Sequence, residues 1–343
     1  MIKIAVDSMG SDNSPYSEVE GAVQAAKAYG VNVILVGKES LLAPLLKEAG
    51  GAGLSSIEIR NATQVITMDE PPTAALRRKK DSSIRVAAEL VRDKTASGLV
   101  SAGNTGAIMA ISKMVFGAVP GVDRPALAAI LPTLAGHAVV LDVGANVTCK
   151  PHHLVQFAVM GHLFSKKIIG VASPRVGLMS VGEEESKGND LTKEVHKALK
   201  QLHLNFIGNV EGRDLYNGRA DVIVCDGFTG NVALKTSEGL IEAVLKLLKD
   251  ELSRNLKAKL GALLSQQSFK RLKKRLDYSE YGGAPLIGLR GVSIICHGRS
   301  SSNAIKNAIR VAREYAENQV NAKLEAELSQ IDHVAKGLAS FNA

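Results

Sequence analysis

The chain has 343 residues, of which 45% are apolar and 22% charged, and this composition excludes a disordered or fibrous protein. Its three cysteines are too few and too widely spaced to predict a disulfide framework or a zinc site. The net charge of +8 leaves nucleic acid, acidic proteins and anionic lipid as partner classes. No apolar stretch approaches the ~18 residues that cross a bilayer, and the first residues are typical of a strand, so we expect a cytoplasmic protein.

Strand and helix signals alternate along the chain. Short runs of Val, Ile, Leu and Ala predict buried strands, and the amphipathic segments between them predict helices. In chain order we expect a strand at 2–6, a helix at 17–29, a strand at 31–36, a helix at 41–49, a strand at 57–59, a helix at 87–92, a strand at 98–101, a helix at 104–115, strands at 139–143, 176–181 and 222–225, helix over 237–276 with a break near 266–267, a strand at 292–296 and a helix at 301–328. This alternation predicts an α/β fold with a mostly parallel sheet covered on both faces.

Four predicted strands lead through loops rich in Gly, Asn or Ser into helices, at 101–106, 142–146, 226–231 and 297–303. In open α/β sheets such junctions bind anions, because helix N-termini present N–H groups and a positive dipole end there. The candidate ligand residues are Gly103, Asn104, Gly106, Asp142, Asn146, Asp226, Gly227, Phe228, Thr229, Gly230, Asn231, His297, Gly298 and Ser300, with Lys235 in the helix after 226–231. Each loop taken alone also fits an ordinary capped turn.

A fifth segment, residues 182–189, contains Lys187 and Asn189 after three acidic residues. Lys187 is either a solvated surface lysine or, if the segment borders a cleft, a clamp on phosphate. The patterns G-x-G-x-x-G, G-x-x-x-x-G-K-[ST], H-E-x-x-H and paired Cys-x-x-Cys are absent from the sequence. Their absence argues against a standard NAD enzyme, a P-loop NTPase and a zinc enzyme.

Ordered motifs extend over nearly the whole chain. They are D-S-M-G-S-D (Asp7–Asp12), S-A-G-N-T-G (Ser101–Gly106), D-R-P-A-L (Asp123–Leu127), D-V-G-A-N-V (Asp142–Val147), P-R-V-G-L (Pro174–Leu178), G-E-E-x-x-K-G-N (Gly182–Asn189), D-G-F-T-G-N (Asp226–Asn231), Y-G-G-A (Tyr281–Ala284) and H-G (His297–Gly298). Through them the chain resembles the bacterial PlsX phosphate acyltransferases, which convert acyl-(acyl carrier protein) and inorganic phosphate into acyl phosphate for phospholipid synthesis. Ser11, Thr148 and Arg299 depart from the family's usual pattern, and Thr148 argues against an acid–base role at its position.

The resemblance implies an α/β/α sandwich related to phosphotransacetylases and isocitrate-type dehydrogenases. It implies one catalytic domain over residues 1–343, with a cleft between two lobes, and no metal or tightly held cofactor. The implied partners are acyl carrier protein, inorganic phosphate, a second copy in a homodimer, and the acyltransferase that uses the product downstream. Peripheral attachment to the inner face of the cell membrane is also implied.

Attack of phosphate on a thioester requires an anion clamp and donors for the developing oxyanion. The thiolate leaves without strong acid catalysis, because the pKa of its thiol is about 8.5. The predicted clamp consists of Lys187, Asn231 and the 227–230 backbone. The candidate oxyanion donors or proton carriers are Asn104 and His297, and Asp226 and Asp142 would orient these groups.

A covalent route through an acyl-cysteine is the alternative mechanism. Cys149, Cys225 and Cys296 are the three candidates. Core packing explains Cys225 and Cys296 better, since each ends a predicted buried strand.

Residues 237–276 are predicted to protrude as a helical hairpin. Nine basic and two acidic residues lie between positions 249 and 275, and leucines recur every three or four residues. This pattern fits packing against a second copy, docking of the acidic acyl carrier protein, or binding to anionic lipid. The candidate docking residues are Leu256, Leu260, Leu263, Leu264, Arg271 and Lys274. Nucleic acid is disfavoured, because only Phe269 is available there for stacking.

A second basic run, Arg77-Arg78-Lys79-Lys80, fits a solvated helix face or, beside a cleft, a surface that attracts phosphate or carrier protein. Two other functions compete with acyl transfer. A decarboxylating NAD(P)-dependent dehydrogenase on the same fold would need a cluster of metal-binding aspartates, which we cannot assemble from the sequence. A non-catalytic lipid- or carrier-protein-binding scaffold would not need so many polar loops.

Overall fold

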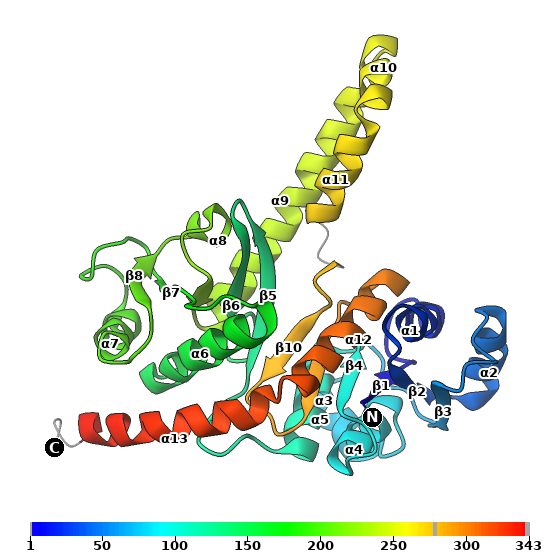
Figure 1. Cartoon of the computed structure of the whole chain (residues 1–343), viewed down its shortest axis with the longest axis horizontal. Helices are drawn as coiled ribbons and strands as arrows, with labels where there is room; N and C mark the ends of the chain where they lie inside the picture. The colour runs from blue at the N-terminus through cyan, green and yellow to red at the C-terminus, as the bar shows by residue number, and fades with distance from the viewer. Residues whose placement is uncertain (1, 277–279, 340–343) are drawn as a thin grey trace.

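The computed structural model describes residues 2–276 and 280–339 of the chain. Within these residues, eleven strands form one sheet in the order β3-β2-β1-β4-β11-β10-β5-β6-β9-β7-β8 (Figure 1). The strands are β1 (Lys3–Asp7), β2 (Asn32–Gly37), β3 (Ile57–Asn61), β4 (Gly98–Ser101), β5 (Ala126–Thr133), β6 (Gly136–Leu141), β7 (Val176–Met179), β8 (Phe206–Val210), β9 (Val222–Val224), β10 (Ala284–Ile287) and β11 (Val292–Ile295).

Helices cover both faces of this sheet. They are α1 (Tyr16–Tyr29), α2 (Glu39–Glu48), α3 (Pro72–Arg78), α4 (Ser83–Arg92), α5 (Thr105–Phe116), α6 (Pro151–Phe164) with the π-helical turn η1 (Ser165–Ile169), α7 (Asp190–Leu199), α8 (Asp214–Asn217), α9 (Gly227–Ser253), α10 (Leu256–Leu264), α11 (Gln266–Leu276), α12 (Ser302–Glu317) and α13 (Val320–Ala339). The predicted α/β/α architecture with a mostly parallel sheet is therefore confirmed.

The burial of β1 shows how the sequence produces two covered faces. Successive side chains of a strand point to opposite faces. Ile4 and Val6 join one apolar cluster with residues of α1, α6 and α12, whereas Ala5 joins a second cluster with residues of α4 and α5. A strand that is buried on both sides needs apolar residues at every position, which explains why the predicted strands are unbroken apolar runs.

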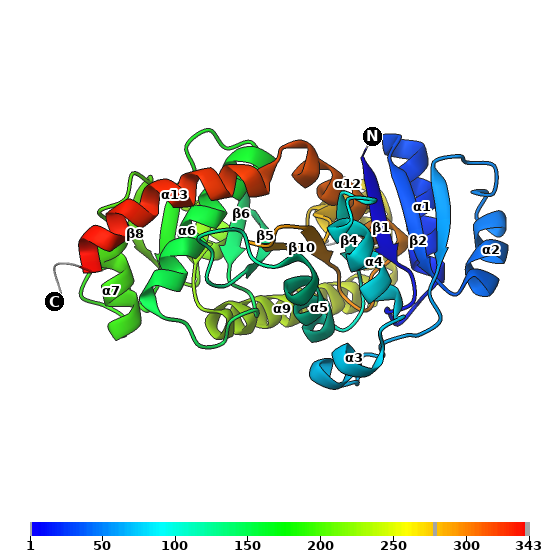
Figure 2. The same cartoon turned by 90° about the horizontal axis from the view of Figure 1, so that it is seen from below.

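The sheet consists of two parallel halves that meet at two antiparallel strands, β5 and β10. β10 has four residues. Its first two, Ala284 and Pro285, pair with β11 of the first half, and its last two, Leu286 and Ile287, pair with β5. Helix α13 is a second connection, because it runs from the end of α12 across to α6 (Figure 2). The two halves are thus held at a narrow joint.

Several predicted elements differ from the structure. β5, β8 and β10 are missing from the predicted strands, although β5 forms a hairpin with the next strand, β6, and β10 forms one with β11. The predicted helix after 226–231 and the first part of the predicted 237–276 helix form one helix, Gly227–Ser253. The long helical segment breaks at Arg254–Asn255 and Ser265 rather than once near 266–267. Asn255 explains the first break, because its side chain accepts a hydrogen bond from the Ala258 amide and caps α10.

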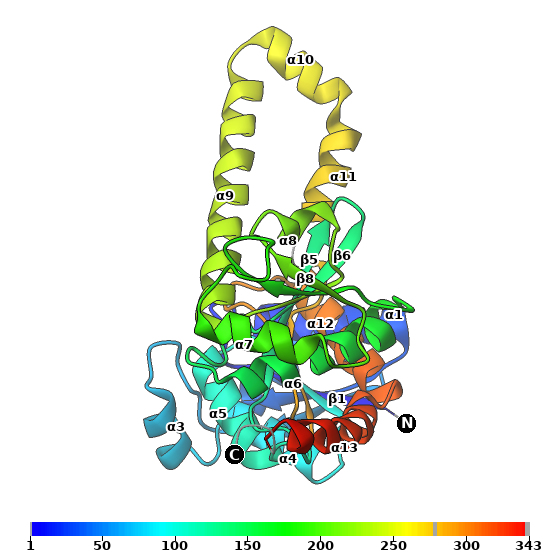
Figure 3. The ribbon, with the colours of Figure 1, turned by 90° about the vertical axis from the view of Figure 1, so that its left-hand side faces the viewer.

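The hairpin of α9, α10 and α11 rises away from the sheet (Figures 1 and 3). Its first helix has 27 residues, of which only Gly227 and Gly230, at the base, are buried. None of the helices in the described ranges is long and apolar enough to cross a bilayer.

Candidate active site

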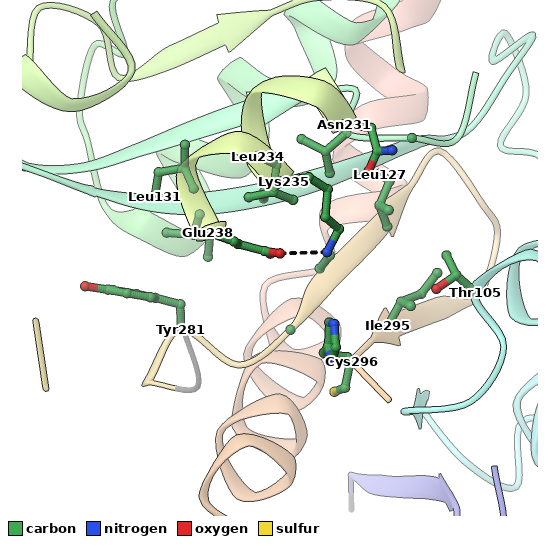
Figure 4. Close-up of a pocket in the computed structure, with 17 residues that line it drawn as sticks. Thr105, Leu127, Leu131, Asn231, Leu234, Lys235, Glu238, Tyr281, Ile295 and Cys296 are labelled. Carbon is green, nitrogen blue, oxygen red and sulfur yellow. Dashed lines mark hydrogen bonds and ion pairs between the residues drawn. The ribbon is translucent and has the colours of Figure 1, made fainter. Parts of the chain in front are cut away.

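A pocket of about 400 Å³ lies where the two halves of the sheet meet (Figure 4). The residues that line it are Thr105, Leu127, Ala129, Ile130, Leu131, Val143, Gly144, Asn231, Leu234, Lys235, Glu238, Tyr281, Gly283, Ala284, Ile295, Cys296 and His297. They come from the segments that follow β4, β6, β9 and β11, and from the joint strands β5 and β10. The site therefore includes both halves of the molecule.

The pocket has an apolar wall and a set of polar groups. Leu127 and Leu131 of β5, Leu234 of α9 and Ile295 of β11 supply much of the apolar surface. The polar side chains are Thr105, Asn231, Lys235, Glu238, Tyr281 and His297. This composition suits a ligand with an apolar tail and an anionic or polar head.

The carboxylate of Asp142 organises the loop beneath the pocket. It is fully buried and accepts hydrogen bonds from the amides of Leu127 (3.0 Å), Gly144 (3.2 Å), Ala145 (3.0 Å) and Asn146 (2.6 Å). The side-chain amide of Asn146 donates a fifth, at 2.9 Å. Burial raises the pKa of Asp142 above its ordinary value, and these hydrogen bonds oppose the rise. Asp142 is thus a buried anchor with no access to substrate.

The first turn of α9 packs directly on this loop. A Cβ atom at Gly230 would lie 2.0 Å from the Asp142 carbonyl oxygen, and one at Gly227 would lie 2.8 Å from the Asn146 backbone. The Gly227 amide donates to the Asn146 carbonyl at 2.8 Å. Asp226 caps the helix, because its carboxylate accepts from the Thr229 amide (2.9 Å) and hydroxyl (2.8 Å).

These contacts limit what the 227–230 backbone can offer to an anion, and its role as a clamp stays a prediction. The amides of Gly227, Thr229 and Gly230 already donate to protein acceptors, and the Asp226 carboxylate is occupied as a cap. The side chain of Phe228 is 62% exposed and outside the pocket lining. The two glycines serve close packing, and the residues that α9 presents to the pocket are Asn231 and Lys235.

Asn104 is also a structural residue, which corrects its prediction as an oxyanion donor. Its side-chain oxygen accepts from the Ala107 amide at 3.0 Å and caps α5. Its side-chain nitrogen donates to the carbonyls of Met68 (2.7 Å) and Glu70 (3.1 Å). The neighbouring Thr105, at the start of α5, is the residue of this loop that lines the pocket.

Four more predicted ligand residues shape loops. The Asn146 side chain donates to the Pro125 carbonyl at 2.8 Å as well as to Asp142, and Asn189 caps α7 through the Thr192 amide. A Cβ atom at Gly106 would lie 2.8 Å from the Pro72 ring. Gly103 packs against Gly10, where a Cβ atom would lie 2.9 Å from the Gly103 Cα. These Asn and Gly residues therefore serve hydrogen bonding within loops, helix capping and close packing of the backbone.

The turn after β11 places His297 in the pocket lining. The imidazole Nδ1 accepts a hydrogen bond from the Arg299 amide at 3.1 Å, so the neutral ring carries its proton on Nε2. The Ser300 amide donates to the His297 carbonyl, and the Gly298 carbonyl accepts from the Asp12 amide. Gly298 and Ser300 are both buried and form the turn that holds the histidine.

Lys235 and Glu238 form an ion pair of 2.7 Å within the pocket (Figure 4). Both side chains are partly exposed to solvent. Such pairs contribute only ~0–1 kcal/mol to stability. Little free energy is therefore lost when Lys235 leaves Glu238 and pairs with an anionic ligand. Sequence reasoning did not select Glu238 or Tyr281, although Tyr281 stands in the Y-G-G-A motif.

Lys187 is exposed and does not line this pocket. Its loop is anchored by the Glu183 carboxylate, which pairs with Arg219 at 2.7 Å and Arg213 at 3.0 Å. The side-chain amide of Asn209 donates to the Glu184 carbonyl at 2.9 Å. These contacts hold the loop away from the pocket in this structure, and the role of Lys187 toward phosphate stays a prediction.

The cysteines lack the properties of a nucleophile. Burial raises the pKa of Cys149 to about 11 and that of Cys296 to about 12, and it raises the pKa of Cys225 well above its ordinary value. The thiolate is the reactive form, and almost none is present at neutral pH. Direct attack by phosphate is therefore favoured over an acyl-cysteine.

One group of side chains in the described ranges has the spacing of a metal site: Asp123, His152 and His153. The Nδ1 atom of His153 accepts from the Lys150 amide at 2.9 Å, so its proton is on Nε2. That Nε2 lies 2.7 Å from the Asp123 carboxylate, to which it donates. A metal would have to displace this proton, so the donor set fits a hydrogen-bonded cluster better than a metal centre.

Comparisons with known proteins identify the family. Residues 2–323 match the family model described as "Fatty acid synthesis protein". The phosphate acyltransferase of Acidobacterium capsulatum is 56% identical over 95% of this chain and 97% of its own length. That of Geotalea uraniireducens is 54% identical over 96% and 95%. The chain belongs to the PlsX family of phosphate acyltransferases.

Solved structures show the fold. The EutD phosphotransacetylase from Staphylococcus aureus superimposes with a TM-score of 0.61 over 92% of this chain and 94% of that one, at 18% identity. A phosphotransacetylase from Streptococcus pyogenes gives a TM-score of 0.57 over the same shares, at 16% identity. The predicted similarity of fold to phosphotransacetylases is confirmed.

Family membership establishes that the protein is an enzyme that transfers an acyl group to phosphate. It favours this activity over the dehydrogenase and scaffold alternatives. The pocket at the joint of the sheet combines an apolar wall with polar groups, a composition that suits such a reaction.

Replacing Asp142 with Asn should destabilise the protein and reduce activity. The side-chain NH2 group of Asn would face the N–H donors that the carboxylate now accepts from. Loss of these charge-assisted hydrogen bonds should lower the free energy of unfolding by about 2–3 kcal/mol. Urea unfolding followed by circular dichroism measures this loss. Asp93→Asn is the matched control, because the Asp93 carboxylate pairs with Arg92 at the surface. Equal unfolding midpoints for the two variants would contradict the anchoring role of Asp142.

Proposed function

We propose that this phosphate acyltransferase takes its acyl group from acyl-(acyl carrier protein) and supplies acyl phosphate for phospholipid synthesis. The observation that carries this proposal is the division of the pocket into an apolar wall and polar groups drawn from both halves of the sheet. A downstream acyltransferase would consume the product.

The apolar wall would hold the first part of the acyl chain. Leu127, Leu131 and Leu234 face the pocket, and burial of each methylene group contributes ~0.8 kcal/mol. The thioester carbonyl would then lie beside the polar groups. This placement excludes water from the reacting carbon, which disfavours hydrolysis.

Lys235 and Asn231 are the best-placed phosphate ligands. They stand one helical turn apart on α9 and both line the pocket. In the described part of the chain, no hydrogen bond from the Asn231 side chain to the protein is recorded, so its amide is available to a ligand. Lys187 stays a further candidate if its loop moves toward bound phosphate.

Thr105 and His297 would stabilise the oxyanion from the opposite half of the sheet. The Thr105 hydroxyl and the Nε2–H of His297 are donors at the pocket surface. A phosphate oxygen forms a bond to the carbonyl carbon, the carbonyl becomes a tetrahedral oxyanion, and the C–S bond breaks. The leaving thiolate takes the proton that the attacking phosphate gives up, or one from solvent.

The hairpin would attach the enzyme to anionic membrane. The side chains of Leu256, Leu260, Leu263 and Leu264 are between 60% and 84% exposed near its tip. Arg271 and Lys274, on the returning helix, would pair with lipid phosphates. The exposed face of α9, with Leu240, Val244 and Leu247, suits packing in a homodimer.

The proposed reaction is tested with purified enzyme, acyl-(acyl carrier protein) and inorganic phosphate, without nucleotide or metal. We expect free carrier thiol and acyl phosphate to appear in equal amounts, and both to depend on phosphate. Thiol release that is independent of phosphate would contradict the proposal.

Lys235→Ala should raise the KM for phosphate by roughly 10- to 150-fold, because a hydrogen bond to a charged group contributes about 1.5–3 kcal/mol. Lys187→Ala, assayed alongside, measures the competing assignment. Lys47→Ala on α2 is the control for loss of an exposed lysine. An unchanged KM for phosphate in Lys235→Ala would show that Lys235 does not bind phosphate.

Leu260→Glu should reduce flotation with vesicles that contain anionic lipid, since a charge at the tip opposes entry into the headgroup layer. Leu41→Glu is the matched control, because Leu41 is 46% exposed on α2. Equal recovery of wild type and Leu260→Glu with the vesicles would rule out this contact. Light scattering of the same samples shows whether the dimer is affected instead.

A further inference from the structure

Helix α3 and the residue pair after it form a basic surface, defined here by Arg77, Arg78 and Lys80. All three side chains are exposed, and within the described ranges none has a recorded ion pair. Two cations of the same segment differ: Lys79 pairs with Glu70, and Arg85 pairs with Glu89. The segment thus compensates some of its positive charges and leaves these three uncompensated.

The α3 surface is fixed beside the pocket. The Asn104 side chain donates to the Met68 and Glu70 carbonyls, just before α3, and Pro72 of α3 packs against Gly106. Thr105, between Asn104 and Gly106, lines the pocket. Figures 2 and 3 show α3 beside α5, on the side of the molecule from which α9 rises.

Core packing accounts for this helix only in part, through Ala75 and the partly buried Leu76. α3 has seven residues and buries only Ala75. Polar contacts hold it in place, since the Lys79 amine also donates to the Val65 carbonyl at 2.6 Å. Because so little apolar surface is buried, the hydrophobic effect alone does not offset the conformational entropy lost when this short helix is ordered.

We propose that the α3 surface docks the acidic carrier protein that delivers the acyl group to the pocket. This inference rests on the proposed function, because it presumes a protein-bound acyl donor. The partner is a folded protein with an acidic face, which would place its thioester at the adjacent pocket.

The arrangement of the cations favours an acidic protein over a free phosphate ion. Consecutive residues of a helix point about 100° apart, so Arg77 and Arg78 diverge and cannot converge on one small anion. They present charge to a broad surface instead. The α3 surface also lacks the cluster of exposed leucines that the hairpin tip offers to lipid.

Charges at the edge of an interface act mainly through association and salt dependence. The test is therefore the double variant Arg77→Glu/Arg78→Glu, assayed with acyl-(acyl carrier protein) and with acyl-pantetheine, which carries no protein and no charge. Lys38→Glu/Lys47→Glu is the matched control, since both lysines are exposed beside or on α2.

In ~50 mM salt, we expect kcat/KM with the carrier-bound donor to be at least about tenfold lower in the double variant than in wild type. In ~500 mM salt most of this difference should disappear, because salt screens the charges. Turnover of acyl-pantetheine and the KM for phosphate should match wild type. Equal kcat/KM with the carrier-bound donor would overturn the docking site, and so would an equal loss with both donors or a raised KM for phosphate. If wild type transfers neither donor to phosphate, the proposed function itself fails.

Discussion

The buried carboxylate of Asp142 accepts five hydrogen bonds, four of them from backbone amides, and the arrangement of the active site depends on it. It fixes the loop after β6. The first turn of α9 then rests on that loop through Gly227 and Gly230, where any side chain would collide with backbone. Because Asn231 and Lys235 follow on the same helix, the loop sets their position in the pocket. The whole hairpin continues from this helix, so Asp142 also sets its direction.

The second constraint is the narrow joint between the halves of the sheet. Thr105 and His297 belong to the first half, and Asn231 and Lys235 to the second. The four groups face one pocket because β10 pairs with β11 through its first two residues and with β5 through its last two. A substrate that contacts both sets spans this joint. Such an arrangement suits a reaction in which one half holds the nucleophile and the other stabilises the carbonyl oxygen.

The positive charge of the chain is distributed over surfaces of different chemistry. At the hairpin, basic side chains accompany exposed leucines, which suits a lipid surface or a second copy. At the α3 surface, uncompensated cations stand without such leucines beside the pocket, which suits an acidic protein. Many other cations are paired with neighbouring acids along helices, as in Arg310–Glu314 and Arg313–Glu317. The total charge alone distinguishes none of these surfaces.

The sequence by itself determined the fold class, most of the parallel strands, the Gly- and Asn-rich junctions and the family, because apolar runs and ordered motifs are local signals. Only the tertiary structure decided which polar side chain of each junction faces the pocket. Asn104, Asp226 and Asn189 satisfy helix N-termini, and Asn146 and Asp142 satisfy each other and nearby backbone, so these groups are consumed internally. The pocket receives the predicted Asn231, Lys235 and His297, together with Thr105, Glu238 and Tyr281. Sequence spacing does not distinguish a cap from a ligand, since both require the same residue types at the start of a helix. The pairing of β5 with β10 was also beyond it, because this pairing joins segments far apart in the chain.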